Sequence, residues 1–251
     1  MKKVQLTIKD STVIAQDTVE MILHNKYVSQ VAQPGQFLHI SVGYQTLRRP
    51  ISIATVDQQH ETVTIIFKIL GGGTKQLATY QPGITLDALG PNGNGFDVNL
   101  DEGSTVLLIG GGVGVPPLHF LGQTLAKKNI NIISVLGFQT EQSVFYEKDF
   151  NQFSDQTYIV TNDGSYGKTG FVTDVLDDIE QFDYYYTCGP LPMLKAVTNQ
   201  LKNKKGYISL EERMGCGVGA CYACVIPTNE EGGYKKICQD GPVFRAQEVI
   251  L

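Results

Sequence analysis

The sequence predicts a multidomain β plus α/β fold: an antiparallel β-barrel, then a doubly wound parallel sheet, then a small C-terminal module. Roughly the first hundred residues alternate between apolar and polar side chains with a period of two, which is typical of half-buried strands. Beyond them, continuous apolar runs alternate with helical stretches, which indicates buried parallel strands. The last segment is glycine-rich and holds four clustered cysteines. We therefore place the domains at residues 1–101, 102–206 and 207–251.

The expected barrel consists of short alternating segments separated by turn signals. Gln33-Pro34-Gly35 and Gln81-Pro82-Gly83 combine residues that favour chain reversal. Many short strands at this spacing are typical of a closed antiparallel barrel. The strands are expected at Val4–Ile8, Thr12–Ala15, Val19–Leu23, Gln36–Val42 and Thr62–Lys68.

The central part of the chain shows the alternation of strands and helices that a parallel sheet requires. Strands are expected at Val106–Ile109, Ile130–Leu136, Tyr158–Thr161 and Tyr184–Thr187, and helices at Pro116–Lys128, Val172–Ile179 and Pro192–Lys204.

Composition narrows the classes of function. A hydrophobic fraction of 42 % over 251 residues can support real cores, and a net charge of −5 without a basic stripe argues against nucleic acid as a ligand. No apolar run is long enough to span a membrane. Met1-Lys2-Lys3 leads into a charged, alternating stretch and not an apolar signal core, so we expect a cytoplasmic protein.

Cysteines provide the most specific signal in the chain. Cys216, Cys221 and Cys224 follow a C-x4-C-x2-C spacing, and Cys238 comes thirteen residues later. This spacing is typical of a plant-type [2Fe-2S] cluster, and the glycines among the ligands allow a tight loop whose N–H groups face the sulfurs. Structural zinc is the main alternative, although its ligands usually come as two separated pairs. Disulfides are a weaker one, because nothing in the sequence indicates secretion.

Three further segments suggest phosphate binding. Gly110-Gly111-Gly112-Val113-Gly114-Val115-Pro116-Pro117 joins a buried strand to a helix, which suits a dinucleotide pyrophosphate. Arg49-Pro50-Ile51-Ser52, expected at the end of a barrel strand, offers a guanidinium and a hydroxyl. Gly71-Gly72-Gly73-Thr74 offers N–H groups at the start of an expected helix over residues 75–80, with Thr74 as its cap. Taken singly, each has an ordinary alternative: a tight turn, a surface arginine or a loop.

Other candidate residues are less informative. Cys188-Gly189-Pro190 ends a strand whose carboxyl end should face the ligand crevice, so Cys188 either lines a nicotinamide pocket or is a buried structural thiol. The four histidines, at positions 24, 39, 60 and 119, are scattered, and we interpret them as structural. No pair of residues suggests general acid–base catalysis.

In this order, the motifs resemble those of the ferredoxin–NADP reductase superfamily, whose flavin barrel carries R-x-x-[ST] and G-[ST] and whose nucleotide domain carries a glycine turn and a C-G-P ending. The C-terminal E-x-R-M-x-C-G-x-G-x-C-x-x-C, followed here by Cys238-Gln239-Asp240-Gly241-Pro242-Val243-Phe244, is similar to the electron-transfer subunits of NAD-dependent (type B) dihydroorotate dehydrogenases. This resemblance covers essentially the whole chain.

The resemblance implies FAD, NAD and a [2Fe-2S] cluster as cofactors. The residues implied to contact FAD are Arg49, Pro50, Ile51, Ser52, Ile66, Phe67, Lys68, Gly73 and Thr74; those implied to contact NAD are Gly110, Gly111, Gly112 and Gly114, with Cys188 beside them. The implied cluster ligands are Cys216, Cys221, Cys224 and Cys238. Glu141, in a stretch without arginine, favours NAD over NADP because a carboxylate suits a ribose 2′-hydroxyl.

The function implied by the resemblance is electron transfer in pyrimidine biosynthesis. Dihydroorotate would be oxidised on FMN in a separate catalytic subunit, and electrons would pass through the cluster and FAD of this chain to NAD⁺, in a heterotetramer of two catalytic and two electron-transfer subunits. Two alternatives stay open: the flavin subunit of another NAD(P)H-linked complex, of hydrogenase or ferredoxin reductase type, and a zinc-stabilised protein without redox activity.

Overall fold

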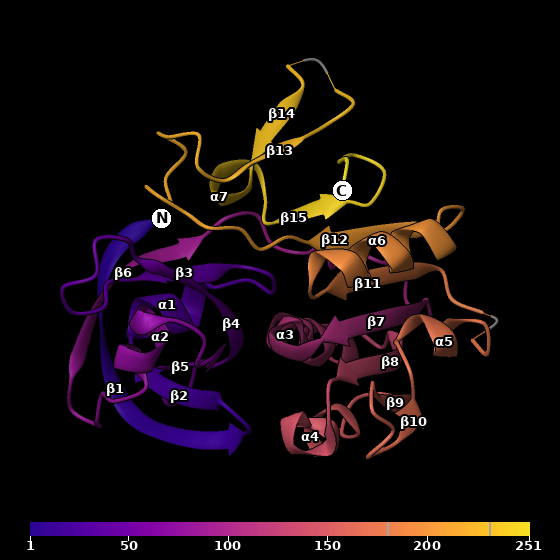
Figure 1. The fold of residues 1–251 in the computed structure, drawn as a ribbon, viewed down its shortest axis with the longest axis horizontal. Helices are drawn as coiled ribbons and strands as arrows, with labels where there is room; N and C mark the ends of the chain where they lie inside the picture. The colour runs from indigo at the N-terminus through magenta and orange to yellow at the C-terminus, as the bar shows by residue number, and fades with distance from the viewer. Residues whose placement is uncertain (180, 231) are drawn as a thin grey trace.

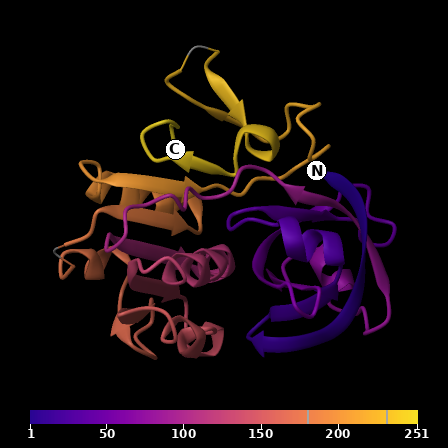
Figure 2. The same cartoon turned by 180° about the vertical axis from the view of Figure 1, so that it is seen from behind.

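A computed structural model describes residues 1–179, 181–230 and 232–251 of the chain. A barrel built from the N-terminal residues lies beside a parallel sheet built from the central residues (Figure 1). The C-terminal residues form a small module at one end of both, and the view from behind shows the same arrangement (Figure 2). The predicted fold class is confirmed.

Six antiparallel strands close the barrel in the order β1-β2-β5-β4-β3-β6. The strands are β1 (Lys2–Ala15), β2 (Thr18–His24), β3 (Phe37–Ile40), β4 (Arg49–Asp57), β5 (Thr62–Lys68) and β6 (Thr85–Asn92), and two short helices, α1 (Lys26–Val31) and α2 (Gly72–Leu77), connect them.

Several barrel elements differ from the prediction. The two strands expected at Val4–Ile8 and Thr12–Ala15 are one continuous strand, β1, with an irregularity between Ile8 and Asp10. Strands β4 and β6 and helix α1 were not predicted. The segment Arg49–Ser52 begins β4, whereas the sequence placed it at the end of a strand. Pro50 does not prevent strand formation here, because it lies near the strand's start.

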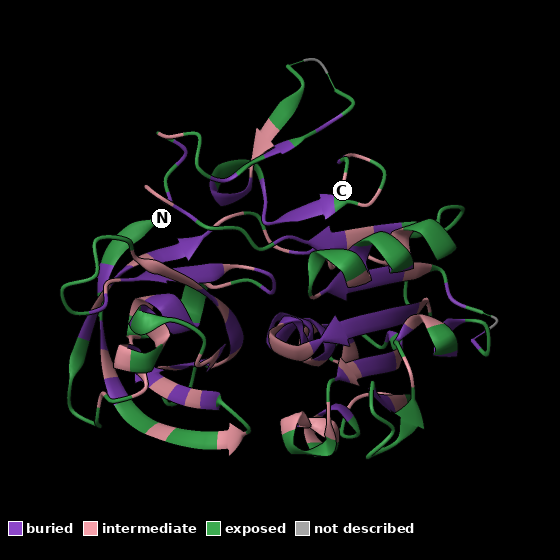
Figure 3. Cartoon of the chain, viewed as in Figure 1, coloured by how far each residue is buried: buried purple, intermediate pink, exposed green. Residues whose placement is uncertain are grey.

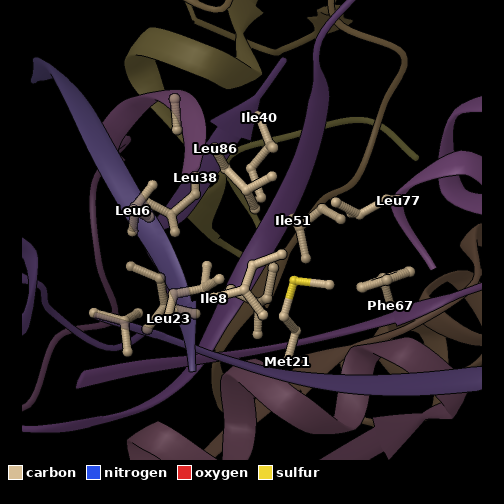
Figure 4. Packing of buried hydrophobic residues seen from close by; sticks show 14 of the residues in the cluster. Leu6, Ile8, Met21, Leu23, Leu38, Ile40, Ile51, Phe67, Leu77 and Leu86 are labelled. Atoms are coloured by element: carbon tan, nitrogen blue, oxygen red, sulfur yellow. The ribbon is translucent and has the colours of Figure 1, made fainter. Parts of the chain in front are cut away.

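Alternating side chains of the barrel strands meet in a closed apolar core (Figure 4). Leu38 and Ile40 of β3 are fully buried there, together with Leu6 of β1 and Met21 of β2. Burying a side chain of this size contributes about 1.5–3 kcal/mol each. The barrel is therefore a rigid platform, and the outward side chains of the same strands are available for other contacts.

The second sheet has seven strands in the order β10-β9-β8-β7-β11-β12-β15. All neighbours are parallel except β12 and β15. The strands are β7 (Thr105–Gly111), β8 (Asn131–Phe138), β9 (Gln156–Thr161), β10 (Lys168–Thr169), β11 (Tyr184–Cys188), β12 (Lys205–Ser209) and β15 (Val243–Arg245). The helical segments are η1 (Gly112–Gly114), α3 (Val115–Ala126), η2 (Glu141–Ser143), α4 (Glu147–Phe150), α5 (Thr173–Leu176) and α6 (Leu191–Gln200).

Both faces of this sheet are apolar, as the continuous hydrophobic runs predict. In β7, Val106 and Leu108 belong to one apolar cluster and Leu107 and Ile109 to another, because successive side chains point to opposite faces. The predicted helices exist, but α5 is only four residues long and α6 ends at Gln200, short of the expected Lys204.

Helix α3 joins the barrel to the sheet. It is buried along most of its length (Figure 3). His119 Nδ1 lies 3.1 Å from the carbonyl oxygen of Ala54 in β4, and Thr55 Oγ1 donates to Gln123 Oε1 at 2.6 Å. Residues 110–114, here called the nucleotide loop, directly precede α3. These contacts therefore fix the position of the nucleotide loop relative to the barrel.

The C-terminal module leaves the sheet after β12 and returns to it as β15. It contains β13 (Val225–Pro227), β14 (Tyr234–Lys236) and α7 (Ile237–Asp240). Its small apolar cluster includes Phe37 of the barrel and Ile208 of the sheet, so the module packs on both neighbours. The proposed division between residues 206 and 207 falls within β12. Among the described residues, no helix is long and apolar enough to cross a membrane.

Candidate cofactor sites

A large crevice of about 710 Å³ lies at the carboxyl ends of the parallel strands. Strand β7 is flanked by β8 on one side and β11 on the other, which makes its end the topological switch point where ligands bind in such sheets. The wall comes from the sheet at Gly111, Gly137 and Gly189, and from the barrel at Thr18 and Lys68. The crevice is therefore a preformed site between the barrel and the sheet.

The glycines of the nucleotide loop have two different structural roles. Gly111 and Gly112 line the crevice, although a Cβ atom on Gly111 would also overlap Met193, which lines the crevice beside it. Gly110 and Gly114 face protein instead: a Cβ atom on Gly110 would lie 3.0 Å from Val115, and one on Gly114 would overlap the Cys188 carbonyl. Of the four glycines predicted to contact NAD, only those that line the crevice are presented to a ligand. Gly110 and Gly114 instead allow close packing of the strand and the helix.

Cys188 lies at the end of β11 and is fully buried in the apolar cluster on one face of the sheet. Burial raises the pKa of its thiol, so it stays protonated. The following residues, Gly189 and Pro190, line the crevice in its place. This is the position of a structural thiol, and a direct contact with NAD stays a prediction.

Strands β4 and β5 separate where the flavin residues are expected. Their pairing begins at Ile53 with Ile65, and before that point β4 pairs with β3 instead. The segments 49–52 and 66–68 are therefore not joined by a ladder, and on this side their backbone groups are free for a ligand. The side chains differ: Phe67 packs inside the barrel, Ile66 packs toward the sheet, and Lys68 lines the crevice.

The predicted phosphate residues of the barrel lie together. A Cβ atom on Gly73 would overlap the Arg49 guanidinium, so the arginine lies directly over this glycine of α2. Arg49 Nη2 donates to Gln45 Oε1 at 3.1 Å, and Nη1 donates to the Leu47 carbonyl. A bound anion would find a guanidinium held in place beside the N–H groups of α2.

Thr74 does not cap the helix as the sequence predicted. Helix α2 begins at Gly72, so Thr74 lies in its first turn and Gly71 is the N-cap. The Thr74 hydroxyl oxygen accepts the N–H of Leu70 at 3.0 Å and that of Gly71 at 3.3 Å. It fixes the entry of the glycine loop, and so has a positioning role close to the one expected.

A second cavity of about 310 Å³ lies between the barrel and the start of the module. Pro50 and Ser52 line it from β4, Phe37 lines it from β3, and the segment 209–214 lines it from the opposite side. Among the residues that the structure describes, Glu211 alone lines both cavities. The residue is solvent-exposed, but the protein groups around its carboxyl desolvate it in part, and this raises its pKa to about 7.

The cysteine loop directs backbone N–H groups at its sulfurs. Cys216 Sγ accepts the N–H of Val218 at 3.4 Å and that of Cys221 at 3.3 Å, and Cys238 Sγ accepts the N–H of Gly219 at 3.2 Å. Such bonds stabilise thiolates and cluster sulfurs. All four predicted ligands are free thiols, so the donor set fits an iron–sulfur cluster.

The four thiols lie close enough to influence one another. Cys216 interacts with the side chain of Cys221, and Cys238 interacts with that of Cys224 and, more weakly, with Cys216. Within the described residues, no three His, Cys, Asp or Glu side chains are grouped as around one metal ion. Four thiols on one short loop and its following helix match the four thiolate ligands of a [2Fe-2S] cluster.

The two ends of this ligand set differ in acidity. Burial opposes ionisation of Cys216, but the N–H groups of Val218 and Cys221 outweigh it and lower its pKa to about 7. Burial, with the neighbouring Cys224, raises the pKa of Cys238 to about 12. Cluster binding must therefore release a proton from Cys238, and we expect ligation to be pH-dependent.

Sequence reasoning missed three polar residues at these sites: Glu211, His39 and Asn92. Glu211 belongs to the quoted E-x-R-M motif, so a signal was present. His39 and Asn92 gave none, because each is a single polar residue in a strand, and only the fold brings the two beside the cysteine loop.

Together, the barrel, the switch-point crevice and the four thiols define a reductase of the ferredoxin reductase type with an appended iron–sulfur module. Residues 108–199 match the family model of the oxidoreductase NAD-binding domain, and residues 211–250 match the iron–sulfur cluster binding domain of dihydroorotate dehydrogenase B. The chain belongs to the family of dihydroorotate dehydrogenase B (NAD(+)) electron transfer subunits. It is 49% identical to such subunits from Bacillus cereus (strain G9842), over 100% of both chains, and from Shouchella clausii (strain KSM-K16), over 100% of this chain and 99% of the relative.

Solved structures of other reductases share the fold. A chain of the NADH-dependent reduced ferredoxin-NADP oxidoreductase is 31% identical, with a TM-score of 0.89, over 98% of this chain and 89% of that one. A ferredoxin NADP+ reductase from Neisseria gonorrhoeae with bound FAD and NADP has a TM-score of 0.69 over 86% of this chain and 96% of that one; at 14% identity it shows the fold alone. The predicted family and the predicted cofactors, FAD, NAD and a [2Fe-2S] cluster, are confirmed.

Proposed function

We propose that the chain is the electron-transfer subunit of a NAD-dependent dihydroorotate dehydrogenase. Electrons from dihydroorotate, oxidised on the FMN of a separate catalytic subunit, would reach NAD⁺ through the cluster and FAD of this chain. Bound FAD can exchange electron pairs with NAD and single electrons with a cluster. The full-length 49% identity to subunits of that name supports the proposal.

The structural observation that carries the proposal is a shared wall. The small cavity is lined on one side by Pro50 and Ser52, which are proposed flavin residues, and on the other by the segment 209–214, which directly precedes Cys216. On its far side Glu211 also lines the nucleotide crevice. The three proposed cofactor sites are therefore contiguous within this chain, as an electron route requires.

The residues of the chain would act by binding and orientation. Arg49 and the N–H groups of α2 would hold the flavin phosphates, Ser52 would contact the flavin, and Gly111 and Gly112 would admit the NAD pyrophosphate close to the backbone. Cys216, Cys221, Cys224 and Cys238 hold the cluster. No general acid–base pair is needed for hydride and electron transfer.

We also propose the assembly and location expected from the sequence: a heterotetramer of two catalytic and two electron-transfer subunits, in the cytoplasm. The cluster ligands support the location, because free thiols persist in a reducing compartment.

The first test is anaerobic purification followed by absorption spectroscopy and iron analysis, before and after addition of NADH. We expect flavin bands, about two irons per chain and bleaching by NADH. A colourless protein with stoichiometric zinc would refute the proposal. The second test adds the FMN-containing catalytic subunit and measures NAD⁺-linked oxidation of dihydroorotate. Absence of a complex, or of any gain in NAD-linked turnover, would contradict the assignment to this enzyme.

One alternative has specific support, since the NADH-dependent reduced ferredoxin-NADP oxidoreductase chain is similar over nearly the whole length. In that case the natural partner would be a complex that exchanges electrons with ferredoxin and NADP. Reduction of this chain by the dihydroorotate-oxidising subunit, but not by reduced ferredoxin, distinguishes the two functions.

A further inference from the structure

His39 differs from the other buried histidine in having no partner for its ring. The side chain is fully buried in β3, and neither Nδ1 nor Nε2 has a hydrogen-bond partner among the described residues. His119, by contrast, has its Nδ1 3.1 Å from the Ala54 carbonyl oxygen. A buried polar group without a partner is destabilising. The His39 ring is therefore placed to bond to something other than the polypeptide.

The strand alternation shows where this ring points. Leu38 and Ile40 face the barrel core, so Phe37 and His39 face outward. Phe37 packs in the apolar cluster of the module together with Cys224 and Cys238, and it also lines the small cavity. His39 is two residues after Phe37 in the same strand, so its side chain lies on the same outward side, toward the cysteine loop.

The contact between this ring and the cysteine loop is close. Gly217 follows the ligand Cys216 and has φ +69°, and a Cβ atom there would lie 2.7 Å from His39 Cε1, with Nδ1 its nearest neighbour. The Nδ1 edge of the ring thus faces the loop at the position of a ligand. Only glycine permits this approach, because of both its backbone conformation and its missing side chain.

A second buried polar side chain supports the same surface. Asn92, in β6 opposite Phe37 of β3, donates its Nδ2 to the Gly217 carbonyl at 3.3 Å. Its Oδ1 has no partner. Two neighbouring barrel strands therefore present a ring and an amide to the same residue of the loop. Asn92 holds the loop in position, and His39 keeps its hydrogen-bonding capacity free.

We propose that His39 donates a ring N–H to a sulfur of the [2Fe-2S] cluster, at or beside Cys216, and so sets the reduction potential of the cluster. The proposal rests on the proposed function in that it requires a cluster in this loop. A hydrogen bond to a cluster sulfur stabilises the reduced, more negative state and raises its potential. Separately, burial and the charges of Arg48 and Arg49 outweigh a backbone contact with Arg48, which falls short of hydrogen-bond geometry, and lower the pKa of His39 to about 4. The ring is therefore neutral and carries a single N–H.

The direct test needs no substitution. The holoprotein is prepared with ¹⁵N-labelled histidine, its cluster is reduced, and pulsed electron paramagnetic resonance is recorded. We expect a histidine nitrogen coupling in the cluster signal, and its loss in His39→Leu. A reduced cluster in the wild type without any histidine nitrogen coupling would overturn the proposal.

A redox titration of the cluster signal measures the size of the effect. His39→Leu should make cluster reduction about tenfold less favourable, which for a one-electron couple is a shift of ~59 mV to lower potential. His39→Asn and His39→Gln place an amide donor near Nδ1 or Nε2, and one of them should recover most of the shift. His119→Gln, at the other buried histidine, should leave the potential unchanged.

The remaining outcomes are also decisive. If His39→Leu leaves the cluster potential unchanged but alters the flavin potential, the ring bonds to the flavin. If neither potential changes, His39 is a packing residue. Either outcome refutes the proposal. Failure of the proposed function is seen separately, as a wild-type protein that shows its cluster signal but does not support NAD-linked oxidation of dihydroorotate.

Discussion

Glycine has different structural roles in the two glycine-rich loops of this protein, the nucleotide loop (110–114) and the cysteine loop (215–224). In the nucleotide loop, Gly110 and Gly114 are required by the protein's own packing, and the crevice they border is already formed. In the cysteine loop, N–H groups point at thiols, and Gly217 lies against a histidine ring without a partner. In the first loop the protein's own groups pack against the glycines. In the second loop the facing His39 ring has no hydrogen-bond partner among the described residues.

The largest expected effect concerns the cysteine loop. Cys221→Ser removes one of four thiolate ligands, so we expect loss of the iron and a fall of at least about 100-fold in NAD-linked dihydroorotate oxidation with the partner subunit. Reduction of the flavin by NADH should persist, because its site is built from other residues. Iron analysis and both assays check this.

Cys188→Ser is the matched control for that variant, because Cys188 lies in the sheet core and not in the loop. It should retain its iron. Loss of iron from Cys188→Ser, or full coupled activity in Cys221→Ser, would break the distinction between the two regions.

An intermediate effect is expected in the nucleotide loop, where two neighbouring glycines should respond differently. Gly114→Ala places a methyl group against the Cys188 carbonyl, so we expect a loss of about 1–3 kcal/mol in stability. In Gly112→Ala the methyl group meets no protein atom, but φ +53° costs about 1–2 kcal/mol and the group enters the crevice. Only Gly112→Ala should also raise the KM for NADH. Equal effects of both variants on stability and KM would contradict the two roles.

The smallest effect concerns Glu211, between the two cavities. Its pKa is raised from 4.5 to about 7, so the folded chain holds this proton more tightly than the unfolded chain does. Its contribution to stability is complete below about pH 4.5 and is lost as the pH rises to about 7. Glu211→Gln cannot ionise and should be the more stable protein at pH 8. Because the residue is exposed, solvent screening reduces this effect, and we expect at most about 1 kcal/mol, or a Tm higher by about 2–4 °C.

The comparison of Tm at pH 5 and pH 8 tests this, with Glu212→Gln as the control for loss of one negative charge. If Glu211→Gln shows the same pH dependence as the wild type, the carboxyl is not desolvated by the cavity walls.

The parts of the fold that the sequence predicted are those with a local cause. The buried run Val106–Ile109 and the spacing of the four cysteines carry their signal within a few residues. Strand β4 was missed because Pro50 and the two preceding arginines interrupt its alternation, and β6 because it contains Gly90 and Pro91. Long-range pairing overrides such local preferences.

The same contrast holds for the sites. Ligand types and glycine blocks were visible in the sequence, but which glycines face a ligand was not, since that depends on Cys188 and Val115 lying opposite. His39 was interpreted as structural because nothing in a single strand indicates that its outward neighbour is a cluster ligand loop. Its isolation arises only when β3, β6 and the loop come together.

The return of the chain to the sheet in β15 has a consequence for the timing of electron flow. Tyr207, Ile208 and Ser209 of β12 pair with Arg245, Phe244 and Val243 of β15. The module begins after β12 and ends in β15, so both of its ends are attached to the sheet. A carrier on a single tether must swing or diffuse between donor and acceptor, and its speed then follows solvent viscosity. A doubly anchored relay keeps its donor–acceptor spacing constant. Electron passage within this subunit should thus be set by distance and driving force alone, and be indifferent to added glycerol.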